Sequence, residues 1–411
     1  NTMQIQTKSL TKVALALTLA ATAACSVASN ADETDPQSIA PEAAESESAL
    51  VGASPERVVA AKLGLPPRFA IGLGNDPEGN DVNRASAYTL GPKVDIHYTY
   101  LSGLPGEGGW TDWNAPSGEY LSMHAKAAKS RGIVPMFTLY QAAAWGENNL
   151  SAFNDAAFMT KYWRGVRTMF ERLGALGSPS IVHLEPDLWG YAQQRGDEPS
   201  LVPMKVGAIV PECVDLPANV AGFGKCAVRL GRKLAPKAVI GLSASKFGAY
   251  DANGNADPAR VARYLNRVGG AEADMVVVET LDRDAGCFEA ATDPNCKRAG
   301  AVYWDETNVR LPNFRDHLAW AKVIRTVTGK PLLWWQLPLG VPSNTPGGAS
   351  GRYRDNRVRY IFSHGWEFAE AGGIGAVFGT GAGNQTTVTT DGGQFKNALS
   401  KYLSLGGSRL N

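Results

Sequence analysis

Two glutamates stand where apolar runs end, at positions where a carboxyl group needs either a partner or a chemical purpose. In the run 180–191, strand alternation places His183 and Glu185 on one face, and Glu279 follows four consecutive apolar residues at 275–278. Burial at an apolar rim raises the pKa of a carboxylic acid, which suits a general acid at neutral pH. Two such carboxyls are the minimal machinery for glycoside hydrolysis, in which one protonates the leaving oxygen and the other attacks or activates water.

We therefore predict Glu185 as the general acid and Glu279 as the partnering base or nucleophile. Asp187 and Asp282 follow them along the chain and are the reserve catalytic carboxylates. The structural alternative for Glu185 is a salt-bridged barrel carboxylate that orients His183 or a lysine.

Aromatic residues separate a sugar site from a generic acidic pocket, because sugar rings present flat C–H faces that stack on indole and phenol rings. Most of the ten tryptophans lie at predicted strand ends or in the loops that follow them. For each residue the alternative is core packing, or hydrogen bonding inside the barrel without substrate contact. The predicted substrate-binding residues are Asn75, His97, Tyr98, Gln141, Trp145, His183, Trp189, Lys246, Trp304, Trp334, Trp335 and Gln336.

The elements that must position these side chains are eight apolar runs, each followed by a helical pattern. That alternation predicts an α/β fold, a single (β/α)8 TIM barrel with long loops on its catalytic face. The rival open sheet would show a glycine fingerprint after the first run, and the stretch 72–76 lacks the third glycine. The strand runs are 68–75, 94–103, 132–141, 180–191, 238–246, 273–284, 331–340 and 373–383.

The first 60 residues have the composition of an export signal and a tether. Lys8 and Lys12 precede an apolar stretch that is too short to span a membrane and that ends at Cys25, as in a bacterial lipoprotein signal. We expect a signal over 1–25 with lipidation of Cys25, a disordered Ser/Ala/Glu-rich tether over 26–60, and a catalytic domain over 61–411. Ordinary cleavage at a nearby small residue is the alternative. Either route predicts an exported protein, in the cell envelope or outside the cell.

Four further cysteines can form disulfides in an exported chain. We expect Cys213 to pair with Cys226 and Cys287 with Cys296, while other pairings and free buried thiols stay open. These spacings lack the tight C-x2-C clusters of zinc sites, and the chain has no H-E-x-x-H motif, so we expect no metal and no cofactor.

The charge balance argues against a nucleic-acid partner. The formal net charge is +1 and the Lys and Arg residues form no stripe. We expect a monomer whose partner is a polysaccharide or oligosaccharide substrate, attached to a membrane only through a lipid on Cys25.

The strand-end carboxylates and rim aromatics make the chain resemble the (β/α)8-barrel glycoside hydrolase superfamily over about 68–403. The resemblance does not extend to one numbered family. The resemblance implies an acid/base glutamate at the end of strand four, which Glu185 matches, and a nucleophilic glutamate at the end of strand seven. That strand reads Trp334-Trp335-Gln336 instead, which puts the retaining mechanism in doubt and favours inversion. The segment Glu185-Pro186-Asp187 also resembles the E-P-D segment of the inverting cellobiohydrolase and endoglucanase family, whose catalytic carboxylates are aspartates.

We therefore expect an exported or lipid-anchored glycoside hydrolase that cleaves a polysaccharide by two-carboxylate catalysis. The main alternative is a non-catalytic carbohydrate-binding barrel lipoprotein, which the missing strand-seven glutamate favours. A metal-dependent barrel hydrolase is the third possibility.

Overall fold

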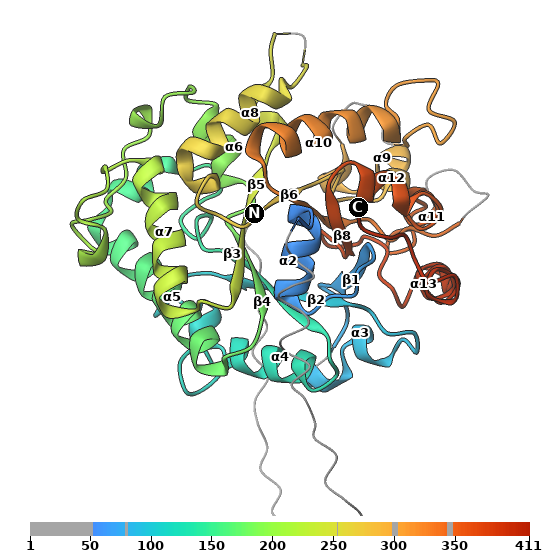
Figure 1. The fold of residues 1–411 in the computed structure, drawn as a ribbon, viewed down its shortest axis with the longest axis horizontal. Helices are drawn as coiled ribbons and strands as arrows, with labels where there is room; N and C mark the ends of the chain where they lie inside the picture. Colours follow the sequence, from blue (N-terminus) through green and yellow to red (C-terminus); the bar gives the residue numbers. More distant parts are fainter. Residues whose placement is uncertain (1–51, 79–80, 253, 298–302, 343–347) are drawn as a thin grey trace, which may run out of the picture. The chain divides into compact units, whose positions relative to one another are not determined.

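Eight parallel strands close into a barrel in the order of the chain (Figure 1). The computed structural model describes residues 52–411 apart from 79–80, 253, 298–302 and 343–347. Each strand lies within one of the eight predicted runs, and β8 pairs with β1, so the predicted TIM barrel is confirmed. The strands are β1 (Ala70–Gly74), β2 (Ile96–Ser102), β3 (Val134–Tyr140), β4 (Ser180–Leu184), β5 (Ala238–Ala244), β6 (Met275–Val278), β7 (Leu332–Leu337) and β8 (Gly373–Phe378).

Helices surround the strands, and α5 (Ala156–Leu176) shows why they form where they do (Figure 1). The Asp155 side chain accepts the amide hydrogen of Phe158 and caps the first turn, and Gly177 ends the helix in the left-handed region. Among the described residues, no helix is long and apolar enough to cross a membrane. The other helices are α3 (Ser86–Thr89), α4 (Glu119–Lys129), α6 (Leu188–Gln193), α7 (Val220–Leu234), α8 (Pro258–Leu265), α9 (Ala285–Ala290), α10 (Phe314–Thr328), α11 (Arg357–Ser363), α12 (Gly365–Glu370) and α13 (Gln394–Ser404).

A further helix, α2 (Pro55–Leu63), packs at the amino-terminal end of the barrel and corrects the predicted tether. Its Lys62 bonds to Asp274, which directly precedes β6, and its Glu56 is paired with Arg325. Buried apolar residues of α2 join the same core as the strands, so residues 55–60 belong to the folded domain and not to a tether. The predicted signal, Cys25 and the tether up to residue 51 lie outside the described residues.

The interior of the barrel is filled by side chains. His183 on β4 lies 2.6 Å from the Ser243 hydroxyl on β5, and its ring contacts Trp335 of β7 edge to face. Trp335 in turn packs against Tyr98 on β2. These buried rings form a floor beneath the carboxyl ends of the strands, as in other packed (β/α)8 cores.

Both predicted disulfides are confirmed. Cys213 is bonded to Cys226 on α7, and Cys287 on α9 is bonded to Cys296. The first closes a loop after β4 and the second closes a loop after β6, so each constrains a connection on the catalytic face.

Candidate active site

Glu185 directly follows the last residue of β4 and does not share the face of His183. Its backbone φ is +47°, in the left-handed region, which turns the side chain out of the alternating pattern. The carboxylate accepts the amide hydrogens of Gln141 and Ala142, both at 3.1 Å, and is fully buried. Burial raises the pKa of Glu185 to about 8, while hydrogen bonds from Ala142, Tyr162 and Gln141 oppose the rise. The predicted inward orientation of Glu185 is wrong, and this carboxyl group instead ties the end of β4 to the end of β3.

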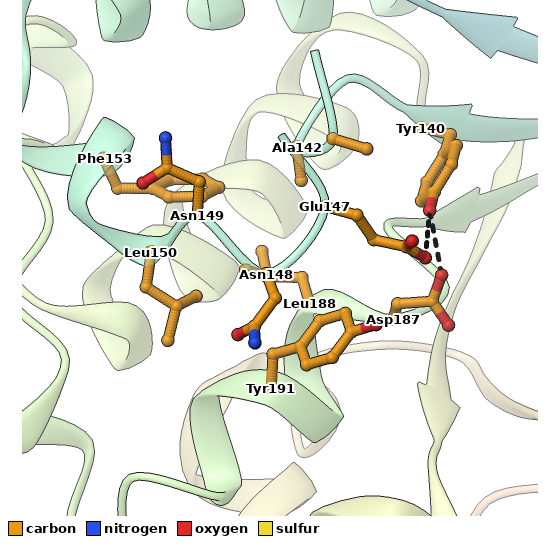
Figure 2. Close-up of a pocket in the computed structure, with 11 residues that line it drawn as sticks. Tyr140, Ala142, Glu147, Asn148, Asn149, Leu150, Phe153, Asp187, Leu188 and Tyr191 are labelled. Atoms are coloured by element: carbon orange, nitrogen blue, oxygen red, sulfur yellow. Dashed lines mark hydrogen bonds between the residues drawn. The ribbon is translucent and has the colours of Figure 1, made fainter. Parts of the chain in front are cut away.

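Asp187, two residues further on, lies beside the pocket at the carboxyl end of β3 and β4 (Figure 2). The Tyr140 hydroxyl at the end of β3 lies 3.0 Å from an Asp187 oxygen and 3.0 Å from a Glu147 oxygen. Burial raises the pKa of Asp187 to about 6, the hydrogen bond from Tyr140 lowers it, and the negative charge of Glu147 raises it. A carboxyl with this pKa can exchange a proton near neutral pH.

The Tyr140 hydroxyl lies between the carboxylates of Glu147 and Asp187. A hydroxyl carries one hydrogen, so Tyr140 can donate to only one of the two carboxylates at a time. Neither Tyr140 nor Glu147 was among the site residues that we predicted, because Glu147 lies in an irregular loop with no strand periodicity. A sequence signal that could have indicated both residues is the tyrosine at the end of β3 followed by a glutamate in the next loop.

Glu279 follows β6 and lies partly accessible at the barrel mouth. Val277 pairs in register with Ser243, which faces the interior, and the charge of Glu279 raises the pKa of Tyr100, whose ring packs on Trp335 of the barrel floor, so Glu279 lies on the side of the barrel mouth. Burial raises the pKa of Glu279 well above its ordinary value, the charges of Asp187 and Asp282 raise it further, and Arg283 opposes them. Asp282 itself is ion-paired with Arg283 at 2.6 Å.

Strand seven provides an amide in place of a carboxylate. A register shift between Trp334 and Leu337, with a positive φ at Gln336, brings Gln336 to the interior, where its amide donates to the Tyr100 hydroxyl. Trp335 is 1% exposed in the floor of the barrel, and Trp334 is fully buried on the helix side, where its indole donates to His317. The prediction that these two tryptophans offer stacking faces is therefore wrong.

Several other predicted binding residues hold the scaffold together. Gln141 accepts a hydrogen bond from Trp110 and donates to the Tyr162 carbonyl, both in the buried layer between β3 and the helices. The His97 ring lies between Tyr88 and Asp76 on the outside of the barrel. Alternation predicted neither orientation, and both correct the assignment to a substrate site.

The remaining predicted residues divide between the scaffold and the rim. Trp189 is buried and donates to the Leu184 carbonyl, Trp304 packs on Phe314, and the Lys246 ammonium lies over the ring of Trp320 outside the barrel. His183 and Tyr98 belong to the floor described above. Two residues stay accessible at the rim, Asn75, which donates to the Thr380 carbonyl, and Trp145.

Among the described residues, one group of potential metal ligands comes close together, Cys287, Asp293 and Cys296. Its two sulfurs are joined in a disulfide, so they are not thiolate ligands for a metal such as zinc.

No family model matches the sequence, and no curated protein matches it. The fold is similar to a GH5 xyloglucan-specific β-1,4-glucanase from a ruminal metagenomic library, with 10% identity and a TM-score of 0.50 over 86% of this chain and 97% of that one. An endo-β-1,4-mannanase from Thermotoga petrophila has 13% identity and a TM-score of 0.44 over 84% and 78% of the two chains. ZgEngAGH5_4 in complex with cellotriose has 11% identity and a TM-score of 0.45 over 85% and 98%. The first likeness shows a shared barrel fold and transfers no residue role.

Proposed function

We propose that this protein is a glycoside hydrolase that cleaves a polysaccharide, with Asp187 and Glu279 as its catalytic pair. The observation that carries the proposal is the presence of two carboxyls with raised pKa values, one after β4 and one after β6, at the same end of one barrel. The charge of Asp187 raises the pKa of Glu279, so the two groups interact. Two interacting carboxyls at this end of a (β/α)8 barrel are the machinery that acid/base hydrolysis of a glycosidic bond requires. The fold shared with a β-1,4-glucanase is compatible with this class.

The two pKa shifts assign the roles. Burial and the charges of Asp187 and Asp282 raise the pKa of Glu279 well above its ordinary value, which suits the group that protonates the leaving oxygen. Asp187 is mostly ionised above about pH 6 and accepts a proton from the attacking water, with Tyr140 orienting its carboxylate. Strand seven carries Gln336 where a retaining enzyme of the superfamily has its nucleophile, so we propose inversion. Asp187 thus replaces Glu185 as the catalytic carboxylate after β4.

We further propose that the protein is exported and attached to a membrane through a lipid on Cys25. Two disulfides in the described domain support an oxidising compartment, and the sequence up to Cys25 supports export.

The test is a panel of soluble polysaccharides with detection of new reducing ends, using protein that begins at residue 52 so that α2 and its Ser54 cap are kept. We expect cleavage of at least one polysaccharide and its loss in Asp187→Asn and Glu279→Gln. Azide restores turnover to a variant that lacks the base, and a substrate with a good leaving group restores it to a variant that lacks the acid. Azide rescue of Asp187→Gly supports Asp187 as the base, and azide rescue of Glu279→Gly would make Glu279 the base instead. Binding of polysaccharide without cleavage by the parent would replace the hydrolase with the carbohydrate-binding barrel.

A further inference from the structure

Two partly exposed tryptophans flank one loop on the catalytic face. Trp113 is 44% exposed and lies in the connection after β2, and Trp145 is 38% exposed and lies in the connection after β3. Most of the other tryptophans are buried, so exposure at these two positions is not the general pattern of the described chain. The loop between them covers residues 103–109.

Both indole N–H groups are bound by this loop. Trp113 donates to the Gly108 carbonyl at 2.9 Å, and Trp145 donates to the Glu107 carboxylate at 3.0 Å. The Asp112 carboxylate accepts the amide hydrogens of Gly106 and Gly108 and so holds the loop in place. Because each indole edge is already engaged, its N–H is not available to a ligand, and the ring offers its apolar surface.

Each ring is also held from behind by another aromatic residue. Trp113 meets Tyr120 edge to face with 4.8 Å between ring centroids, and Trp145 meets Phe158 in the same way at 5.1 Å. These contacts and the hydrogen bonds fix the orientation of the rings before any ligand arrives. Preorganised rings lose little side-chain entropy on binding.

The two carboxylates beside the rings are engaged by neighbouring groups. Glu107 is paired with Lys161, and Asp112 is satisfied by backbone amides. A surface of fixed aromatic rings whose neighbouring carboxylates are already engaged matches the flat C–H face of a neutral pyranose.

The position of Trp145 connects this surface to the proposed catalytic centre. Trp145 lies two residues before Glu147, whose carboxylate lies at the Tyr140 hydroxyl in the pocket of Figure 2. We infer that Trp113 and Trp145 form a tryptophan platform that binds neutral polysaccharide on the β2–β3 side of the barrel mouth. This inference names the substrate class of the proposed hydrolase and rests on that function for its biological meaning, although binding is measured without turnover.

The experiment is affinity gel electrophoresis in gels that contain mixed-linkage β-glucan, xyloglucan or galactomannan, with Asp187→Asn as the parent so that the polysaccharide stays intact. We expect at least one polysaccharide to retard the parent. Trp113→Ala and Trp145→Ala should each weaken binding roughly 3- to 10-fold. Trp366→Ala is the matched control, because Trp366 is 48% exposed on α12, away from the loop, and its loss should leave retardation unchanged.

Trp145→Phe distinguishes a stacking face from a merely structural residue, because phenylalanine keeps an aromatic ring but loses the bond to Glu107. It should retain more affinity than Trp145→Ala at equal thermal stability. The platform is overturned if no polysaccharide retards the parent, if both alanine variants bind like the parent, or if Trp366→Ala weakens binding equally. Retardation without hydrolysis by the wild-type chain would remove the proposed function and leave the platform intact. Hydrolysis by the wild-type chain, together with unaltered binding in both alanine variants, would overturn the platform and leave the proposed function intact.

Discussion

The ends of β4 and β6 look alike in sequence and differ in structure. A glutamate directly follows the last apolar residue of each strand, yet Glu279 lies at the barrel mouth whereas Glu185 turns away from the inward face of β4. The difference arises from one backbone torsion, the positive φ of Glu185, and from two amides at the end of β3 that receive its carboxylate. Two residues later, Asp187 takes the place beside Tyr140. The backbone torsion at the residue after the strand, and the hydrogen-bond partners within its reach, therefore decide whether such a carboxyl group serves the scaffold or faces the mouth.

Removal of the two carboxyls that face the mouth should have the largest effect. We expect Asp187→Asn and Glu279→Gln to lower kcat by roughly 10²- to 10⁴-fold, the usual contribution of a general acid or base. Initial rates on the preferred polysaccharide measure the loss, and thermal unfolding should show that both variants stay folded. A variant that keeps the parental rate would remove its residue from the pair.

Glu185→Ala tests the scaffold role of Glu185 through the stability of the protein. The substitution leaves the buried amides of Gln141 and Ala142 without their acceptor, which should lower the free energy of unfolding by roughly 2–4 kcal/mol. Urea denaturation measures the change. A variant as stable as the parent, with turnover lost as completely as in Asp187→Asn, would return Glu185 to the catalytic centre.

Removal of each disulfide tests the loops that follow β4 and β6. Loss of either bond, by Cys213→Ser with Cys226→Ser or by Cys287→Ser with Cys296→Ser, should cost roughly 2–3 kcal/mol of stability for loops of this size. The second disulfide joins Cys287 on α9 to Cys296 in the connection after β6, which also carries Asp282, so only its loss should also reduce activity at temperatures where both variants are folded. Equal activity of the two double variants would show that the loop after β6 needs no covalent constraint.

The smallest expected effect is a displacement of the pH profile. Activity should rise through an apparent pKa of about 6 as Asp187 ionises, and fall at higher pH as Glu279 loses its proton. Glu147→Gln removes a negative charge that raises the pKa of Asp187, so the acidic limb should move to lower pH. Tyr140→Phe removes a hydrogen bond that stabilises the carboxylate, so the same limb should move to higher pH. Profiles of kcat/KM measure both shifts, and displacement in one common direction would contradict this arrangement of the three side chains.

Periodicity predicted the barrel and its eight strands, because apolar runs separated by amphipathic helices have few other ways to bury their faces. The pairs of cysteines were also predictable from their number and spacing in a chain that reads as exported. The apolar run before Glu279 also indicated a carboxyl group at the end of β6, and its catalytic role stays a prediction. These features depend on short-range patterns, which the amino-acid sequence carries directly.

Only the tertiary structure decided which polar strand ends face the mouth. Glu185 and Gln336 both have a positive φ, so each departs from alternation, and Glu185 leaves the mouth whereas Gln336 enters it. Trp334 and Trp335 are neighbours in sequence, yet one packs under α10 and the other forms the barrel floor. Glu147 reaches Tyr140 through an irregular loop that no period describes. The sequence determined the barrel and its acidic rim, whereas long-range packing determined which carboxyls of that rim meet, because backbone torsions at strand ends follow the partners they find in space.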